Sequence, residues 1–201
     1  MQFTETEIPG VWIIEPRRFG DERGYFMESF KLHEFEAHIG TVNFVQDNES
    51  MSTRGVLRGL HFQKGDKAQA KLVRVSAGNV VDVAVDLREN SPTLGRYIMV
   101  ELSQQNGRQL FIPRGFAHGF VVMSDTAQFQ YKVDNIYAPE AECTLRFDDP
   151  ALGIPWPINR DDMILSAKDL KGLSLKDLGL SRASGSDARR TPVAEQTPLQ
   201  A

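Results

Sequence analysis

Four side chains that can take part in proton transfer lie within runs of otherwise strand-like character. His61 lies near the end of the apolar run GVLRGLHFQ, two residues before its last letter. His118 lies in AHGFVVM, Lys71 in AKLVRV and Tyr131 in QFQYKV. Each has an ordinary structural interpretation: a hydrogen-bonded core histidine, a lysine that reaches solvent from an edge, or a packed tyrosine. A buried charged lysine is costly, however, and such a cost is tolerated where it serves a ligand or a reaction. Four such residues on separate strands favour a functional site.

The elements that must position these residues are short strands. Apolar runs separated by turn residues recur at spacings of about ten residues, which is typical of an antiparallel sandwich or barrel. Within VVDVAVDL, the period of two predicts that Val81, Val83 and Val85 share one face. Segment 31–40 has helical spacing and ends in Gly40, a natural helix stop. Without alternating long helices, a parallel α/β sheet is not expected. The sequence predicts an all-β core with a few short helices.

Composition limits the function classes. The net charge of −4 argues against a general nucleic-acid binder, which would be basic. Cys143 is the only cysteine, so neither an intramolecular disulfide nor a cysteine-based zinc site is available. The first ten residues lack a signal-peptide pattern, and no apolar stretch reaches the length of a membrane-spanning helix. We therefore expect a cytoplasmic protein with no membrane contact.

The chain is expected to form one domain with a tail. Residues 1–180 have ordinary globular composition, and segment 17–24 is expected to be a loop between two strands. Residues 181–201 are rich in small and polar residues and contain almost no large apolar ones. Such a segment cannot bury enough surface to offset its ordering entropy, and we predict that it is disordered.

Two glycine-led motifs resemble those of the cupin superfamily. The segment GRQLFIPRGFAHGF places its glycines, a proline and His118 at the spacing of the second cupin motif. The first motif, G-x5-H-x-H followed by a glutamate, is matched by Gly55 and His61, but Gln63 replaces its second histidine and the glutamate is missing. The resemblance implies a jelly-roll barrel, and the incomplete ligand set argues against a bound metal.

A closer resemblance covers residues 19–169, where the segments recur in order with the expected separations. The chain is similar to the dTDP-4-dehydrorhamnose 3,5-epimerase family in DERGYFMESF, FVQDNES, GVLRGLHFQ, AKLVRVSAGNVVDVAVDLRENSPTLG, RQLFIPRGFAHGF, YKVDNIYAPE, DDPALGIPWP and ILSAKD. The substrate of that family is a dTDP-4-keto-6-deoxyhexose, used in making dTDP-L-rhamnose. Its C3 and C5 flank the C4 ketone, which acidifies both protons, so neither a redox cofactor nor a metal is required.

The resemblance assigns roles to individual residues. It implies that His61 is the base, with Asp169 completing a dyad that orients the imidazole and stabilises its protonated form. Lys71 would stabilise the negative charge that develops on the C4 oxygen, and Tyr131 would return a proton from the opposite face. His118 would contact the sugar or the enolate oxygen.

The same resemblance implies a nucleotide-binding set. Arg23 and Arg58 would contact the diphosphate, to which forked guanidinium donors are suited. Tyr137 would stack on the base. Further substrate contacts are expected from Glu28, Gln46, Asp47, Asn48, Glu142 and Lys168. The family resemblance also implies a homodimer in which N-terminal residues reach the site of the partner.

Three local features of the sequence bear on these assignments. Ser166 and Asp169 have the spacing of a capping box, which competes with the dyad unless one carboxylate serves both. Arg58 and His61 have opposite parity in a regular strand, and Gly59 between them offers a bulge that could re-aim one of them. Arg114, where the family often has glutamate, is expected to face solvent.

Three alternative functions remain open on the sequence alone. One is an enzyme that epimerises only C3 of the same kind of sugar. The second is a cupin that binds a sugar or nucleotide without catalysis, although such a module needs no acid and base together. The third is a metal-dependent cupin, which would contain stoichiometric iron, zinc or manganese.

Overall fold

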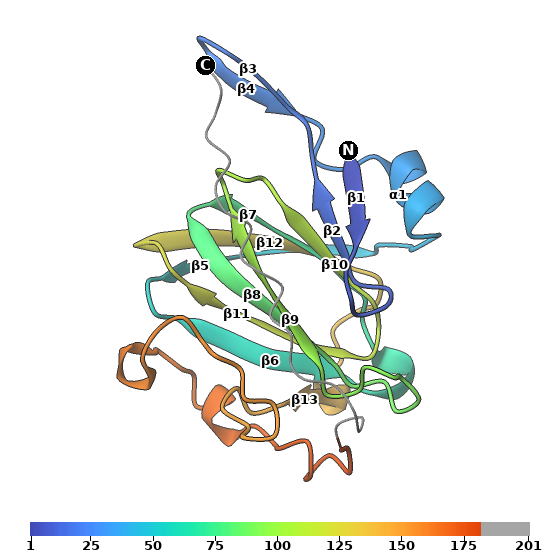
Figure 1. Cartoon of the computed structure of the whole chain (residues 1–201), viewed down its shortest axis with the longest axis vertical. Helices are drawn as coiled ribbons and strands as arrows, with labels where there is room; N and C mark the ends of the chain where they lie inside the picture. Colours follow the sequence, from blue (N-terminus) through green and yellow to red (C-terminus); the bar gives the residue numbers. More distant parts are fainter. Residues whose placement is uncertain (182–201) are drawn as a thin grey trace.

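The computed structural model describes residues 1–181, and the strands account for most of its regular structure (Figure 1). The strands are β1 (Gln2–Glu5), β2 (Trp12–Glu15), β3 (Arg18–Asp21), β4 (Gly24–Met27), β5 (Gln46–Thr53), β6 (Leu57–Gln63), β7 (Lys71–Ala77), β8 (Asn79–Asp86), β9 (Tyr97–Ser103), β10 (Gln109–Ile112), β11 (Phe116–Val122), β12 (Thr126–Val133) and β13 (Glu142–Thr144). The helices are α1 (Leu32–His38) and the short 3₁₀ turns η1 (Gly65–Lys67), η2 (Pro139–Ala141), η3 (Arg160–Asp162) and η4 (Asp169–Lys171).

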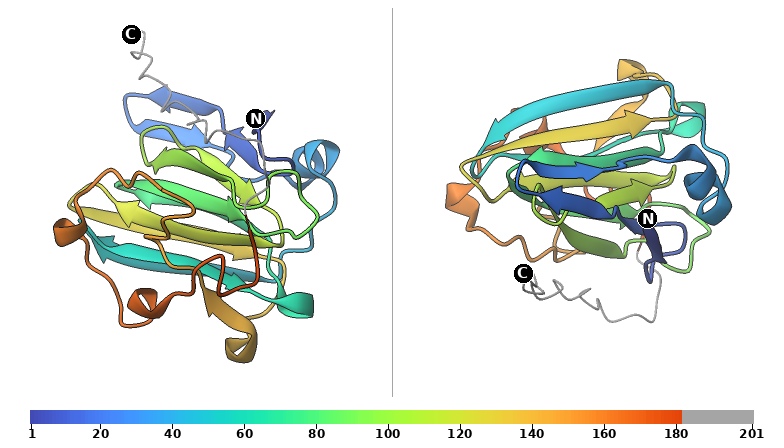
Figure 2. Two further views of the ribbon diagram at one scale, coloured as in Figure 1. Left: turned by 60° about the horizontal axis from the view of Figure 1, so that its bottom comes forward. Right: turned by 90° about the horizontal axis from the view of Figure 1, so that it is seen from above.

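Two antiparallel sheets form the body of the protein. The six-stranded sheet has the order β1-β2-β10-β7-β12-β5, and the five-stranded sheet has the order β13-β6-β11-β8-β9 (Figures 1 and 2). The main core lies between them, where Val73 and Phe129 of the first sheet pack with Val80, Ala84 and Phe120 of the second. The predicted all-β, cupin-type jelly roll is confirmed.

The C-terminal part of the chain covers the second face of the five-stranded sheet. Val83 and Val85 of β8 pack there against Leu145, Leu152 and Leu175, which belong to the segment that lies beneath this sheet in Figure 1. The valine face predicted for this strand is therefore buried, but so is the opposite face, which points into the core between the sheets. An acidic residue in β8 consequently has no access to water and needs a partner.

The N-terminal region departs from the sequence-based expectation. Residues 18–21, expected in a loop, pair with residues 24–27 as a two-stranded hairpin that projects from the body at the top of Figure 1. The predicted helix is present as α1 and buries Phe35, whereas Leu32 at its start is 53% exposed.

The predicted disordered tail lies outside the described residues except for Ser181, and it stays a prediction. The single-domain assignment of residues 1–180 likewise stays a prediction. Within residues 1–181, no helix combines the length and the apolar character that crossing a membrane demands.

Candidate active site

The four residues singled out from the sequence line one cavity between the two sheets. His61 and His118 come from β6 and β11 of one sheet, and Lys71 and Tyr131 come from β7 and β12 of the other. The cavity has a volume of about 190 Å³ and also contacts Arg58, together with Glu49, Ser50, Gly119, Phe120 and Phe129. Inward-pointing positions of facing strands converge here, which explains why residues from 61 to 131 meet in one place.

His61 is held by a buried carboxylate. Its Nε2 lies 2.6 Å from Oδ1 of Asp169, which is only 3% exposed and arrives on η4 of the C-terminal segment. Burial alone would raise the pKa of Asp169, but the hydrogen bonds from His61 and Ser166 keep that pKa below its ordinary value. The ionised carboxylate fixes a proton on Nε2, which leaves Nδ1 of His61 free to accept one.

The capping box and the dyad use the same carboxylate through different oxygens. The Ser166 hydroxyl donates to Oδ2 of Asp169 at 2.6 Å, and the Asp169 backbone N–H donates to the Ser166 Oγ at 3.2 Å. The backbone N–H of Gly59 donates to Oδ1 at 3.3 Å. One carboxylate therefore closes a local turn and orients the imidazole, so the two sequence interpretations of Asp169 are compatible.

A bulge in β6 brings Arg58 and His61 to the same cavity. His118 is opposite His61, and Phe120 is opposite Arg58, so β6 contains one more residue than β11 between these two pairs. Gly59 lies inside it with a φ of +122°, and an added Cβ would lie 2.6 Å from the Gly119 Cα. The extra residue reverses the parity of the strand, as the sequence suggested. The Arg58 Nε then donates to the hydroxyl of Ser52 at 3.0 Å.

A second histidine–carboxylate pair lies deeper in the barrel. Nε2 of His118 is 2.9 Å from Oδ2 of Asp82, whose side chain is fully buried. Burial lowers the pKa of His118, although Asp82 acts in the opposite direction, so the imidazole is neutral at pH 7 and donates Nε2–H to the carboxylate. No role was predicted for Asp82 from the sequence. It could have been singled out in the same way as Lys71, because it is a charged residue inside an apolar strand.

The remaining two groups differ in their protonation chemistry. Burial lowers the pKa of Lys71 to about 8, while Asp82 and Glu142 act to raise it. Burial raises the pKa of Tyr131 above its ordinary value, and Arg58 opposes that effect. At pH 7 the cavity therefore contains a charged ammonium and a protonated phenol, the forms needed to stabilise an anion and to donate a proton.

A linked group of polar residues lies beside this site. The Tyr137 hydroxyl donates to Oε2 of Glu142 at 2.8 Å, and Lys168 forms an ion pair with the other carboxylate oxygen. Glu142 affects the pKa values of Lys71 and Tyr131, and Lys168 precedes Asp169 in the chain. Three predicted substrate contacts are thus brought together at the edge of the site.

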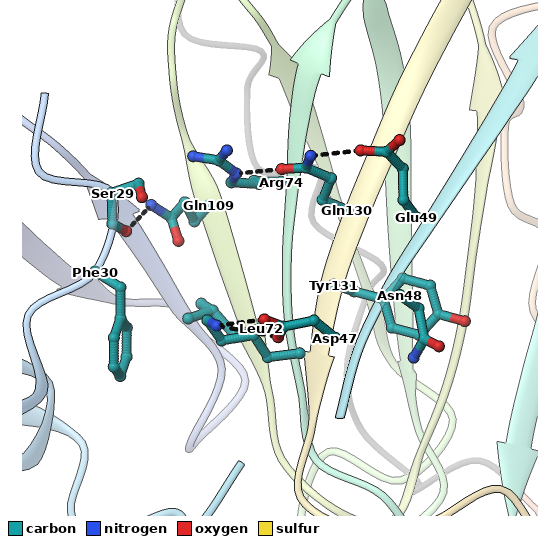
Figure 3. A pocket seen from close by; sticks show the side chains of 11 residues that line it. Ser29, Phe30, Asp47, Asn48, Glu49, Leu72, Arg74, Gln109, Gln130 and Tyr131 are labelled. Carbon is teal, nitrogen blue, oxygen red and sulfur yellow. Dashed lines mark hydrogen bonds and ion pairs between the residues drawn. The ribbon is translucent and has the colours of Figure 1, made fainter. Parts of the chain in front are cut away.

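The predicted contacts in β5 are divided between the two faces of the sheet. Asn48 is directly opposite Tyr131 and shares its face, and Gln46 donates to the Asn48 side chain at 2.7 Å. Asp47 has the opposite parity and pairs with Lys132 at 3.0 Å beside a second hollow of about 380 Å³, which Asn48 and Tyr131 also line (Figure 3). Within one chain, Asp47 therefore points away from the cavity. The resemblance grouped three consecutive residues that one extended strand cannot aim in one direction.

The N-terminal contacts lie apart from the cavity of their own chain. Arg23 occupies the projecting hairpin, where its side chain is 85% exposed and pairs with Asp21. Glu28 pairs with Lys31 at 2.6 Å. Arg114 faces solvent as expected and forms an ion pair with Asp134. In the part of the chain that is described, no three histidine, cysteine or acidic side chains are grouped so as to hold a metal ion.

Comparison with known proteins gives a consistent family. The family model of dTDP-4-dehydrorhamnose 3,5-epimerase matches residues 5–177. The enzyme of that name from Salmonella typhimurium is 55% identical over 166 residues, which are 82% of this chain and 90% of that protein. The structure of a dTDP-6-deoxy-D-glucose-3,5-epimerase from Legionella pneumophila, in complex with dTDP-4-keto-L-rhamnose, has a TM-score of 0.84 and 48% identity, covering 90% of this chain and 97% of the other.

A monoepimerase is also similar, at lower identity. The structure of a 3'-monoepimerase from Streptomyces bikiniensis, in complex with dTDP-quinovose, has a TM-score of 0.80 and 33% identity, covering 88% of this chain and 90% of the other. The double epimerases named above share more of the sequence, and the family model covers strands β2 to β13 and the segment that carries Asp169. The chain belongs to the dTDP-4-dehydrorhamnose 3,5-epimerase family.

Proposed function

We propose that the chain converts dTDP-4-dehydro-6-deoxy-D-glucose to dTDP-4-dehydro-L-rhamnose by proton transfer at C3 and C5 within the cavity between the sheets. The observation that carries the proposal is the convergence of four groups on one space: the His61–Asp169 dyad, Lys71 and Tyr131. A base, an acid and a fixed cation are the set that epimerisation beside a ketone requires. A module that only binds sugar nucleotides has no use for all of them.

In the first step, Nδ1 of His61 removes the proton from C3 or C5. The electron pair of the C–H bond moves into the C4 carbonyl, which becomes an enolate. Asp169, 2.6 Å from Nε2, stabilises the imidazolium that forms. The Lys71 ammonium, charged below a pKa of about 8, stabilises the enolate oxygen in a region from which water is largely excluded.

In the second step, the Tyr131 hydroxyl donates its proton to the same carbon from the other side, and the carbonyl re-forms. The two residues belong to strands of opposite sheets, β6 and β12, which supports placing the sugar between them. The raised pKa of Tyr131 keeps the phenol protonated until the carbanionic carbon develops. The His61 imidazolium then gives its proton to solvent, solvent returns a proton to the Tyr131 phenolate, and the same two steps repeat at the second carbon.

The nucleotide end of the substrate is assigned to the polar edge of the site. Arg58, anchored by Ser52, is suited to the diphosphate because a guanidinium offers forked donors to phosphate oxygens. Tyr137 is exposed and held by Glu142, as a ring that stacks on a base requires. Asn48 and Gln46 share the inner face of β5 and supply amide groups.

We also propose that two copies associate through the N-terminal hairpin. Phe19, Tyr25 and Phe26 are exposed on it, and β5 forms an unpaired edge of the six-stranded sheet. Such an arrangement would carry Arg23 and Glu28 to the partner's cavity. If it does, mixing two inactive variants, His61→Ala and Arg23→Ala, restores about a quarter of wild-type activity through mixed dimers. A monomer by sedimentation, or no recovery on mixing, argues against it.

Incubation with the dTDP-4-keto sugar in deuterated water tests the reaction. The proposal requires deuterium at both C3 and C5 of the product, observed by proton NMR. Deuterium at C3 alone would replace the proposal by the C3-specific alternative, and no exchange would favour a binding module. The cytoplasmic location expected from composition stays a prediction, which cell fractionation tests.

A further inference from the structure

Gln63 occupies the position at which a metal-binding cupin places its second histidine, and its side chain is buried and fully engaged. Its Nε2 donates to the backbone oxygen of Lys67 at 2.6 Å and to that of Ile136 at 3.1 Å. Its Oε1 accepts the backbone N–H of Ala138 at 2.7 Å. The amide therefore uses both donors and one acceptor position on backbone groups, and none of these bonds is to a side chain of the catalytic set.

Two of the three backbone partners, Ile136 and Ala138, are the residues on either side of Tyr137 in the loop between β12 and β13. The oxygen of residue 136 and the N–H of residue 138 are both fixed by one planar amide, so the backbone on either side of the tyrosine is held against β6. The backbone of Gln63 is also paired with Glu142, the residue that accepts the Tyr137 hydroxyl. Gln63 thus supports Tyr137 in two ways. Its side chain holds the backbone on either side of the tyrosine, and its own backbone holds Glu142, which accepts the hydrogen bond of the tyrosine hydroxyl.

We propose that Gln63 is a positioning residue that sets the orientation of Tyr137 and thereby the affinity for the nucleotide part of the substrate. The inference rests on the proposed function, because Tyr137 is given the nucleobase there. Tyr137 is 54% exposed and has little packing of its own, so its orientation depends on these backbone bonds. Since none of these bonds is made to His61, Lys71 or Tyr131, the chemical steps do not depend on them directly.

The amide is the appropriate group for this task. A histidine at position 63 could not offer two donors and an acceptor in one plane, and a glutamate would direct a carboxylate at two carbonyl oxygens. A glutamine at a position where other cupins have a metal-binding histidine thus has two consequences. The set of metal ligands is incomplete, and the side chain stabilises the loop that carries Tyr137.

The test uses Gln63→Leu, which removes all three bonds, and Gln63→Glu, which keeps only the acceptor. For the purified full chain, we expect the Kd for dTDP by calorimetry and the KM for the sugar nucleotide to rise about tenfold or more, because several buried hydrogen bonds are lost. The value of kcat stays within about twofold. A purely structural role predicts a lower Tm and a smaller active fraction with unchanged Kd and KM, and that result would overturn the inference.

Two further measurements separate the explanations. In a Tyr137→Ala background, Gln63→Leu is expected to have no additional effect on the Kd for dTDP, because the two residues act as one unit. Fully additive effects would contradict the proposal. Gln69→Leu is the matched control. Gln69 donates to the backbone oxygen of Asn135 at 2.7 Å in the same loop, but Asn135 is not a direct neighbour of Tyr137 in the chain. The Kd of this variant for dTDP should stay within about twofold of the wild-type value. If the wild-type protein neither binds dTDP nor converts the dTDP-4-keto sugar, that result refutes the proposed function instead.

Discussion

Replacing Lys71 by methionine should stabilise the fold at pH 7 and at the same time remove activity. The ammonium lies in the cavity without an ion-pair partner at contact distance among the described residues, and burial lowers its pKa from 10.5 to about 8. At about 1.4 kcal/mol for each pKa unit, this difference corresponds to about 3.5 kcal/mol of unfavourable free energy in the charged folded state. Because the amine is partly exposed to the cavity, this figure is an upper bound.

The sign of the pH dependence follows from the two pKa values. Below pH 8, Lys71 is charged in both states, and the folded state bears the full cost of burying the charge. Between pH 8 and 10.5, the unfolded chain binds more protons at this residue than the folded one does, so the free energy of unfolding of the wild type rises with pH. The advantage of Lys71→Met is therefore largest at pH 7 and fades toward pH 10.5.

Urea denaturation at matched protein concentration measures this difference directly. Lys64→Met is the control, because Lys64 is exposed, and it should change the free energy of unfolding by less than about 0.5 kcal/mol. We expect Lys71→Met to lower kcat/KM at least about a hundredfold. We also expect wild-type activity to fall as pH rises through about 8. A Lys71→Met variant that is less stable than wild type at pH 7, or whose advantage does not change with pH, would refute the reasoning.

Other variants test the remaining groups of the cavity. Asp169→Asn should lower kcat about a thousandfold or more, because the amide no longer holds the proton on Nε2 of His61; an unchanged pH–rate profile would count against the dyad. Ser166→Ala should lower kcat about tenfold with little change in KM, since it frees Oδ2 of Asp169, and Ser166→Thr should restore activity. Tyr131→Phe should still exchange substrate protons with deuterated water but fail to invert the carbon, as NMR can show. Arg58→Lys should raise KM about tenfold through loss of the forked contact, and an unchanged KM would place the diphosphate elsewhere.

The sequence identified the residues of the cavity better than their surroundings. His61, His118, Lys71 and Tyr131 stood out because each interrupts an apolar strand, and the alternation of side chains along these strands explains how all four can face one cavity. The reversal of parity at Gly59 was also accessible, since a glycine inside a strand often marks a bulge. These features are local, and the period of the strand is sufficient to predict them.

The partners of these residues could not be predicted in the same way. Asp82 meets His118 across 36 residues, and only the pairing of β8 with β11 brings them together. Asp169 reaches His61 across 108 residues, and its placement came from family resemblance. The inward face of Asn48 and the outward face of Asp47 depend on where β5 pairs with β12, which no local pattern specifies.

The hairpin and Gln63 illustrate a different limit. Residues 18–21 carry the turn-forming letters of a loop, yet they pair with residues 24–27 because the turn between them is tight. In the sequence, Gln63 was notable only because it replaces the second histidine of the first cupin motif. Its proposed role depends on the backbone groups that it contacts, which only the structure shows. Side chains that serve backbone atoms of distant loops leave no periodic signal in a sequence.

The removal of the C3 and C5 protons by His61 is tested most directly by comparing wild type with His61→Ala in deuterated water. Circular dichroism first establishes that the variant is folded. Proton NMR of the dTDP-4-keto sugar then follows exchange at the two carbons. We expect deuterium at both positions for wild type and none above the uncatalysed background for His61→Ala. Exchange near the wild-type rate in the folded variant would contradict the assignment of His61 as the base.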